Sequence, residues 1–144
     1  MDILREAQKL IASPESPYSK MELERVYVVF DKDDLSIDEL NKAMLEANRL
    51  GYKIGFSNEA FELWLLLHFN IVNRRMTRVN LKNELSKIIG RKYTKADDRF
   101  LRKVADNIET AFENSVFMTE DVLFDKNPYT NIGHIIKEVY ISSN

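Results

Sequence analysis

The chain has 144 residues and a formal net charge of -2, with 44% hydrophobic and 31% charged side chains. This composition is typical of a single compact domain and excludes a disordered or fibrous chain. Cysteine is absent, which excludes a disulfide framework, a thiolate zinc site and a cysteine nucleophile, and no apolar run is long enough to cross a bilayer, so we expect a soluble, cytoplasmic protein.

The chain begins with a predicted helix, loop and strand. Apolar residues at helical spacing predict a helix over residues 3–11, and a segment rich in proline and serine predicts a loop over residues 13–20. Arg25–Phe30 is the clearest strand, because its run of β-branched and aromatic residues is typical of a strand buried on both faces. This strand ends abruptly at Asp31.

A helix and a second strand are expected next. Ser36 and Glu39 form a capping-box pattern, in which the serine hydroxyl accepts from the third helical N–H and the glutamate reaches back to the cap. The pattern predicts a helix over Ile37–Leu50, Gly51 as its left-handed C-cap, and a short strand over Tyr52–Phe56. Strand, helix and strand in this order predict a right-handed parallel crossover.

The second half of the chain is predicted to be helical. The segment Phe61–Phe69 is so apolar that, as a helix, it must be buried nearly all round, and Ser57 and Asn58 are its candidate cap. Only two strands are evident, and because a parallel pair is not expected to stand alone, a third strand from a terminal segment, a partner chain or further sequence would complete the sheet. Further helices are expected over residues 79–89, 95–117 and 130–141, with turns at Gly90 and Asn127-Pro128.

Three aspartates directly follow the first strand. In open α/β sheets the ligand crevice lies outside the carboxyl ends of the strands, which is where we expect Asp31, Asp33 and Asp34. Carboxylates gathered at one point repel each other unless a cation neutralises them, and Mg²⁺ or Mn²⁺ prefers such oxygen ligands. A solvated acidic turn that caps the next helix is an equally good interpretation.

A second polar cluster follows the second strand, where parallel neighbours would bring Ser57, Asn58 and Glu62 beside the aspartates. Glu62 stands in an apolar stretch, and a carboxylate is almost never fully buried without a partner or a metal ion. It could instead point to solvent at a helix N-terminus. His68 is the stronger site candidate of the two histidines, although a neutral imidazole bonded within the core is the more common role.

The middle of the chain is strongly basic. Residues 71–103 contain eleven Lys or Arg against three acidic residues, a net charge of +8. Such a segment could neutralise nucleic-acid phosphates, although many charge runs are solvated helix faces, and Tyr93 could offer an aromatic surface to a base. The cations that we expect to contact nucleic acid are Arg74, Arg75, Arg78, Arg91 and Lys92.

Three stretches resemble one known family. VYVVFDKDD, SNEAFELWLLLHF and NPYTNIGHIIKEV look like the corresponding segments of RloB-family proteins and span most of the chain. The resemblance implies an α/β fold with a small, Toprim-like parallel sheet flanked by helices and a helical C-terminal half. The family usually begins with a strand and a glutamate motif that are absent before Ser13 here, so we expect a single domain over residues 1–144 that is truncated at its N-terminus.

The resemblance also implies a function. RloB proteins are encoded with AAA-type ATPases in restriction-linked and abortive-infection loci, and they resemble split relatives of the OLD nucleases. By this likeness Asp31 and Asp33 correspond to a Toprim D-x-D pair that binds divalent metal, and Ser57 and Glu62 belong to the second cluster. The weaker transfers are Asp34, Asn58 and His68.

The leading interpretation is a Mg²⁺- or Mn²⁺-dependent nuclease component of a phage-defence system that acts on nucleic acid, expected to be DNA, with an AAA-type ATPase partner. In it Asp31, Asp33 and Glu62 are catalytic, and the metal ligands are Asp31, Asp33 and Asp34. The alternative is a non-catalytic module that binds nucleic acid or the ATPase and keeps a vestigial acidic site. An exposed sheet edge would also favour a homodimer.

Overall fold

The computed structural model describes residues 2–12 and 25–142, so the loop predicted at residues 13–20 lies outside the described residues. The chain divides into two compact units whose sequences interleave. Unit 1 contains residues 1–29 and 34–55, and unit 2 contains residues 30–33 and 56–144. Residues 30–33, at the end of the first strand, therefore belong to the same unit as the helical second half of the chain.

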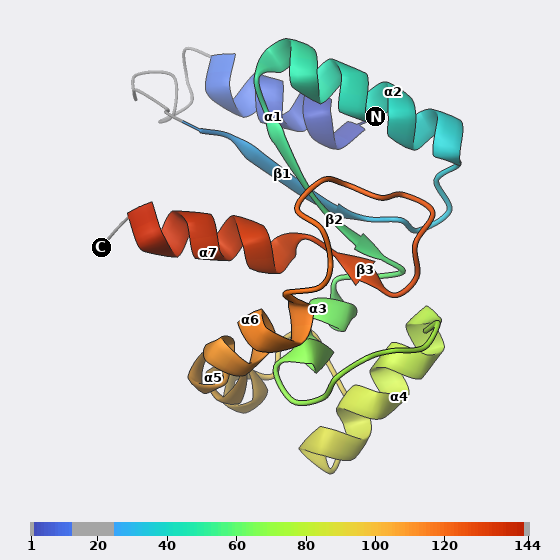
Figure 1. Ribbon diagram of the computed structural model, residues 1–144, viewed down its shortest axis with the longest axis vertical. Coiled ribbons are helices and arrows are strands. Elements are labelled where there is room, and N and C mark those ends of the chain that lie inside the picture. The colour runs from blue at the N-terminus through green and yellow to red at the C-terminus, as the bar shows by residue number, and fades with distance from the viewer. Residues whose placement is uncertain (1, 13–24, 143–144) are drawn as a thin grey trace. The chain divides into compact units, whose positions relative to one another are not determined.

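Unit 1 holds the first two helices, α1 (Asp2–Ala12) and α2 (Ile37–Leu50), which lie side by side in Figure 1. α2 has its predicted bounds: the Ser36 hydroxyl accepts from the Glu39 N–H at 3.1 Å, and Gly51 ends the helix with a φ of 75°. The capping box is only half formed, because the Glu39 carboxylate accepts from the Ser36 hydroxyl at 3.3 Å rather than from the backbone.

The first two strands confirm the predicted parallel pairing. β1 (Tyr27–Asp31) and β2 (Lys53–Asn58) point the same way in Figure 1. The Lys53 N–H donates to the Val26 carbonyl at 2.9 Å, and the Lys32 N–H donates to the Ser57 carbonyl at 3.1 Å, so the pairing advances in the same direction along both strands. Asp31 is the last residue of β1, one residue beyond the predicted end of the strand, and because Val29 is 42% exposed the expected burial on both faces is wrong.

A third short strand, β3 (Tyr129–Thr130), completes the sheet in the order β1-β2-β3. It pairs antiparallel with β2, with Thr130 opposite Ser57, so the sheet is mixed rather than purely parallel. The missing strand thus comes from the C-terminal segment, one of the three alternatives considered. It follows the Asn127-Pro128 peptide bond, which is cis and marks the predicted turn.

The apolar segment after β2 forms the centre of unit 2. All six residues of α3 (Glu62–Leu67) are buried, as the apolar sequence predicted. This helix packs against α4 (Arg78–Ile89), α6 (Ile108–Ser115) and β3. α4 begins with a complete capping box at Thr77 and Asn80, and Gly90 ends it in the left-handed conformation.

Two predicted boundaries in unit 2 are wrong. β2 continues through Asn58, so Ser57 and Asn58 do not cap α3, which has no side-chain cap at Phe61. The single helix expected over residues 95–117 is two helices, α5 (Asp98–Asp106) and α6, which are separated at Asn107. The Asn107 side chain donates to the Lys103 carbonyl at 2.7 Å and satisfies an acceptor at the end of α5.

The last helix, α7 (Ile132–Ser142), packs tightly against α6. A Cβ atom on Gly133 would lie 2.6 Å from the Ser115 hydroxyl oxygen and 3.0 Å from the Trp64 ring. No side chain fits at this position without movement of its neighbours. The glycine therefore allows α7 to lie close to the core around α3.

We expect Gly133→Ala to lower the free energy of unfolding by about 1–3 kcal/mol, because an added methyl group overpacks this contact. Urea unfolding measures the change. In a Ser115→Ala background the nearest atom is gone, and the same substitution should cost less. An equal cost in both backgrounds would contradict the proposed contact.

Candidate functional site

Unit 2 brings two predicted site carboxylates beside an arginine. Asp31 lies at the end of β1, and its Oδ1 accepts from the backbone N–H of Phe61 at 2.8 Å, just before α3. Arg78, the first residue of α4, places Nη2 3.1 Å from Asp33 Oδ1 and 3.7 Å from Asp31 Oδ2. Asp33 has a φ of 50°, a left-handed conformation that aspartate tolerates better than most residues. The acidic turn thus has an internal counter-ion.

Glu62 is the second carboxylate of this cluster. It is the first residue of α3 and is 4% exposed, so the prediction of burial is confirmed and the solvent-facing alternative is wrong. Within residues 2–12 and 25–142 its carboxylate accepts no hydrogen bond and forms no ion pair. The Glu62 carboxylate oxygens are not among the fully buried atoms without a hydrogen-bond partner in the described residues, so water or a cation can reach them.

The charge of Glu62 reaches Asp31. Burial raises the pKa of the Asp31 carboxyl above its ordinary value, while the Phe61 N–H lowers it. The negative charge of Glu62 raises this pKa further, and the positive charges of Arg78 and Lys95 oppose that effect. Two carboxylates and two cations therefore share one electrostatic environment.

Tyr93 and Lys95 also belong to this environment; Lys95 was not predicted as a site residue, and Tyr93 was predicted only as a surface for a base. Tyr93 is 9% exposed and packs edge-on against Phe100, so the interpretation of its ring as a surface for base stacking is wrong. Burial raises its pKa to about 12, and the charge of Glu62 adds to the rise. No local sequence signal could identify Tyr93 and Lys95 as site residues, because the loop between α4 and α5 brings them near Glu62 and Asp31.

A family model for RloB-like proteins matches residues 1–139. The chain belongs to the RloB-like family. No curated protein and no solved structure matches it. The match confirms the resemblance carried by the three sequence stretches and covers both clusters of predicted site residues.

The other second-cluster candidates of this RloB-like chain are engaged in the core. Ser57 and Thr130 share a hydroxyl hydrogen bond of 2.8 Å between β2 and β3. The Asn58 amide donates to the Lys126 carbonyl at 2.7 Å and holds the loop before β3. His68 is 1% exposed, its Nδ1 lies 2.8 Å from the Trp64 carbonyl, and burial lowers its pKa. These hydrogen bonds indicate that each of the three side chains stabilises the fold.

The predicted nucleic-acid-binding cations differ in their pairing. Arg74 lies 3.7 Å from Glu84, Arg91 pairs with Asp97, and Arg78 pairs with the acidic turn as described above. Arg75 and Lys92 are exposed and have no ion-pair partner in the part of the chain that the structure describes. Contact with nucleic acid stays a prediction for all five.

The carboxylates are chemically suitable ligands for a divalent metal ion, but in the described residues they do not form a complete coordination site. No three Asp, Glu or His side chains in residues 2–12 and 25–142 form a group that could hold a metal ion. Mg²⁺ nevertheless often takes only one or two protein carboxylates and completes its shell with water and phosphate oxygens. Asp31 and Glu62 can supply two such ligands. Asp34 is exposed and belongs to unit 1.

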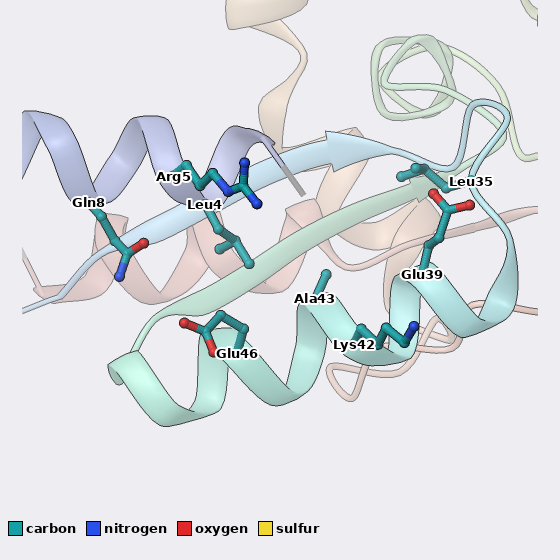
Figure 2. A pocket seen from close by; sticks show the side chains of 8 residues that line it. All are labelled: Leu4, Arg5, Gln8, Leu35, Glu39, Lys42, Ala43 and Glu46. Carbon is teal, nitrogen blue, oxygen red and sulfur yellow. The ribbon is translucent and has the colours of Figure 1, made fainter.

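Unit 1 contains a separate cavity of about 390 Å³ between α1 and α2. Figure 2 shows Leu4 and Ala43 directed toward it, with charged side chains around them. The charges come from two cations, Arg5 and Lys42, and from two glutamates on α2. The positive and negative charges are equal in number, and none of the predicted site residues lines this cavity.

None of the helices in the described ranges is long and apolar enough to cross a membrane.

We expect the pKa of Asp31 to lie above its ordinary value and to respond in opposite directions to two neighbours. Arg78→Gln should raise it further by removing a positive charge, whereas Glu62→Gln should lower it by removing a negative one. An NMR titration of the Asp31 carboxyl carbon measures both shifts. Arg74→Gln removes a cation that pairs elsewhere and serves as the control; shifts of the same sign in the two test variants would contradict the arrangement.

Proposed function

We propose that this RloB-like chain is a Toprim-like, Mg²⁺- or Mn²⁺-dependent nuclease component of a restriction-linked or abortive-infection phage-defence system. Its substrate is a nucleic-acid phosphodiester, and its partner is an AAA-type ATPase. The family membership supports this proposal. The observation that carries it is Glu62, a 4% exposed residue whose carboxylate has no hydrogen bond or ion pair within the described residues and whose charge acts on Asp31 at the end of β1.

Asp31 and Glu62 are the residues that would hold the metal ion. Two neighbouring, half-buried carboxylates repel each other, and a divalent cation between them relieves both the repulsion and the cost of partial burial. A bound metal ion would supply a Lewis acid and a more acidic water molecule for phosphodiester hydrolysis. Asp33, at the turn, remains a candidate ligand once Arg78 is displaced from it.

Arg78 has two proposed tasks at this site. In the absence of metal its guanidinium neutralises Asp31 and Asp33, which keeps the acidic turn compact. When a divalent cation takes over that neutralisation, the guanidinium is released to contact a phosphate, since its planar donors suit phosphate oxygens. Metal binding and phosphate binding would thus be coupled through one side chain.

The second candidate function is a non-catalytic module that binds nucleic acid or the ATPase. It is favoured by the same ion pairs, because an acidic turn that an arginine already neutralises does not require a metal ion. The buried Glu62 favours the nuclease, since the described residues leave that charge without a direct partner. Metal binding separates the two functions.

We expect Mn²⁺ to bind the chain, and we expect Asp31→Asn and Glu62→Gln each to weaken that binding at least about tenfold, because each removes a charged ligand. Calorimetry measures the affinity, and cleavage of labelled DNA and RNA with Mn²⁺ measures the activity. Asp38→Asn, which changes an exposed carboxylate in the first turn of α2, is the matched control. Binding that survives in both site variants would leave the non-catalytic module as the better proposal.

We expect Arg78→Gln to tighten Mn²⁺ binding about three- to tenfold, because it removes a positive charge that competes for the same carboxylates. The same calorimetric titration measures this gain. Arg74→Gln removes a comparable exposed arginine from the Glu84 pair and should leave the affinity unchanged. Weaker binding in Arg78→Gln would show that the guanidinium supports the metal site instead of competing with it.

A further inference from the structure

The cations of the basic segment are mostly paired up to Arg91 and unpaired beyond it. Arg74, Arg78, Lys87 and Arg91 all lie within 4 Å of carboxylates that the structure describes. Beyond Arg91 the pattern changes. After Arg91 every exposed cation of the segment lacks a carboxylate partner in the described ranges, namely Lys92, Lys95, Arg99, Arg102 and Lys103, whereas before it only Arg75 and Lys82 do.

Three of these cations form one stripe along α5. Residues three and four apart lie on the same face of a helix, so Arg99, Arg102 and Lys103 project from one side. The adjoining face carries Phe100, which is 3% exposed and anchors the helix to the core. Asp106 ends the stripe at the last residue of α5. α5 as a whole contains three cations and two aspartates, Asp98 and Asp106, so its net charge is +1 and the charge of the stripe is partly offset.

The inner face of α5 connects this stripe to the acidic site. The Phe100 ring lies 5.6 Å from that of Phe69 and 6.1 Å from that of Tyr93. Tyr93 is near enough to Glu62 for the carboxylate to perturb its hydroxyl, and Lys95 acts in the same way on Asp31. The cations thus begin at the wall of the site and continue outward along α5.

We infer that the cations of residues 92–103 form the surface that holds the phosphate backbone of the nucleic acid beside the acidic site. This inference rests on the proposed nuclease function, since it concerns the substrate of that site. α5 runs for about 13 Å, a length along which one strand of B-DNA carries about four phosphates. Lysines and arginines without carboxylate partners contact phosphates at no cost in broken ion pairs, unlike Arg74 and Arg91.

The test compares three charge-neutralised variants of the full chain in binding labelled 20-base-pair DNA at several salt concentrations in EDTA. The α5 variant carries Arg99→Gln, Arg102→Gln and Lys103→Gln. We expect it to reduce the steepness of log affinity against log salt by about 3, since each phosphate contact contributes about 0.9. The paired-cation variant, Arg74→Gln with Arg91→Gln, should change the slope by less.

A matched control removes three exposed cations elsewhere, through Lys42→Gln, Lys126→Gln and Lys137→Gln, and should leave the slope unchanged. An α5 variant that keeps the wild-type slope and the wild-type thermal midpoint overturns the inference, as does a wild-type chain that binds no nucleic acid. Because EDTA removes the metal, failure of the nuclease proposal appears differently: the steep slope is present, yet Mn²⁺ neither binds nor supports cleavage. The same assay with single-stranded DNA and RNA identifies the form of the substrate.

Discussion

The carboxylates of Asp31 and Glu62 share a half-buried part of unit 2, and the cost of keeping two negative charges there shapes the surrounding structure. Burial and mutual repulsion both favour the protonated form of Asp31. The hydrogen bond from the Phe61 N–H and the positive charge of Arg78 favour the ionised form of Asp31 instead. Glu62 receives no comparable direct donor from the described residues. Among the described residues Asp31 therefore has compensating partners and Glu62 has none, and this difference distinguishes a candidate ligand site from a solvated acidic turn.

The secondary structure around the site explains how these groups reach one another. β1 delivers Asp31 at its carboxyl end, and β2 leads into α3, whose first residue is Glu62. The Asp31 carboxylate accepts the N–H of Phe61, the residue just before α3, and so takes the place of a side-chain cap there. Arg78 enters from the first turn of α4, which packs against α3. A single hydrogen bond thus joins strand end, helix start and acidic turn.

Local patterns in the sequence predicted the elements whose ends depend on local chemistry. Ser36 and Gly51 bound α2, and Gly90 ends α4, because caps act through hydrogen bonds and backbone angles within a few residues. The two-residue β3 has no such local pattern. It depends on pairing with β2, which is more than seventy residues away in the chain. The break at Asn107 was also missed, because the apolar spacing of α5 and α6 is compatible with one continuous helix.

The same distinction applies to the site. The end of an apolar strand and a carboxylate in an apolar run are visible in the sequence, so Asp31, Asp33 and Glu62 could be selected as candidates. Which cations neutralise them is decided by tertiary packing, and composition gives only the excess of charge in residues 71–103. Arg78 meets the acidic turn because α4 packs on α3, whereas the cations of α5 face away from the core because Phe100 is buried. One basic segment therefore supplies both the counter-ion of the acidic turn and a separate set of unpaired charges.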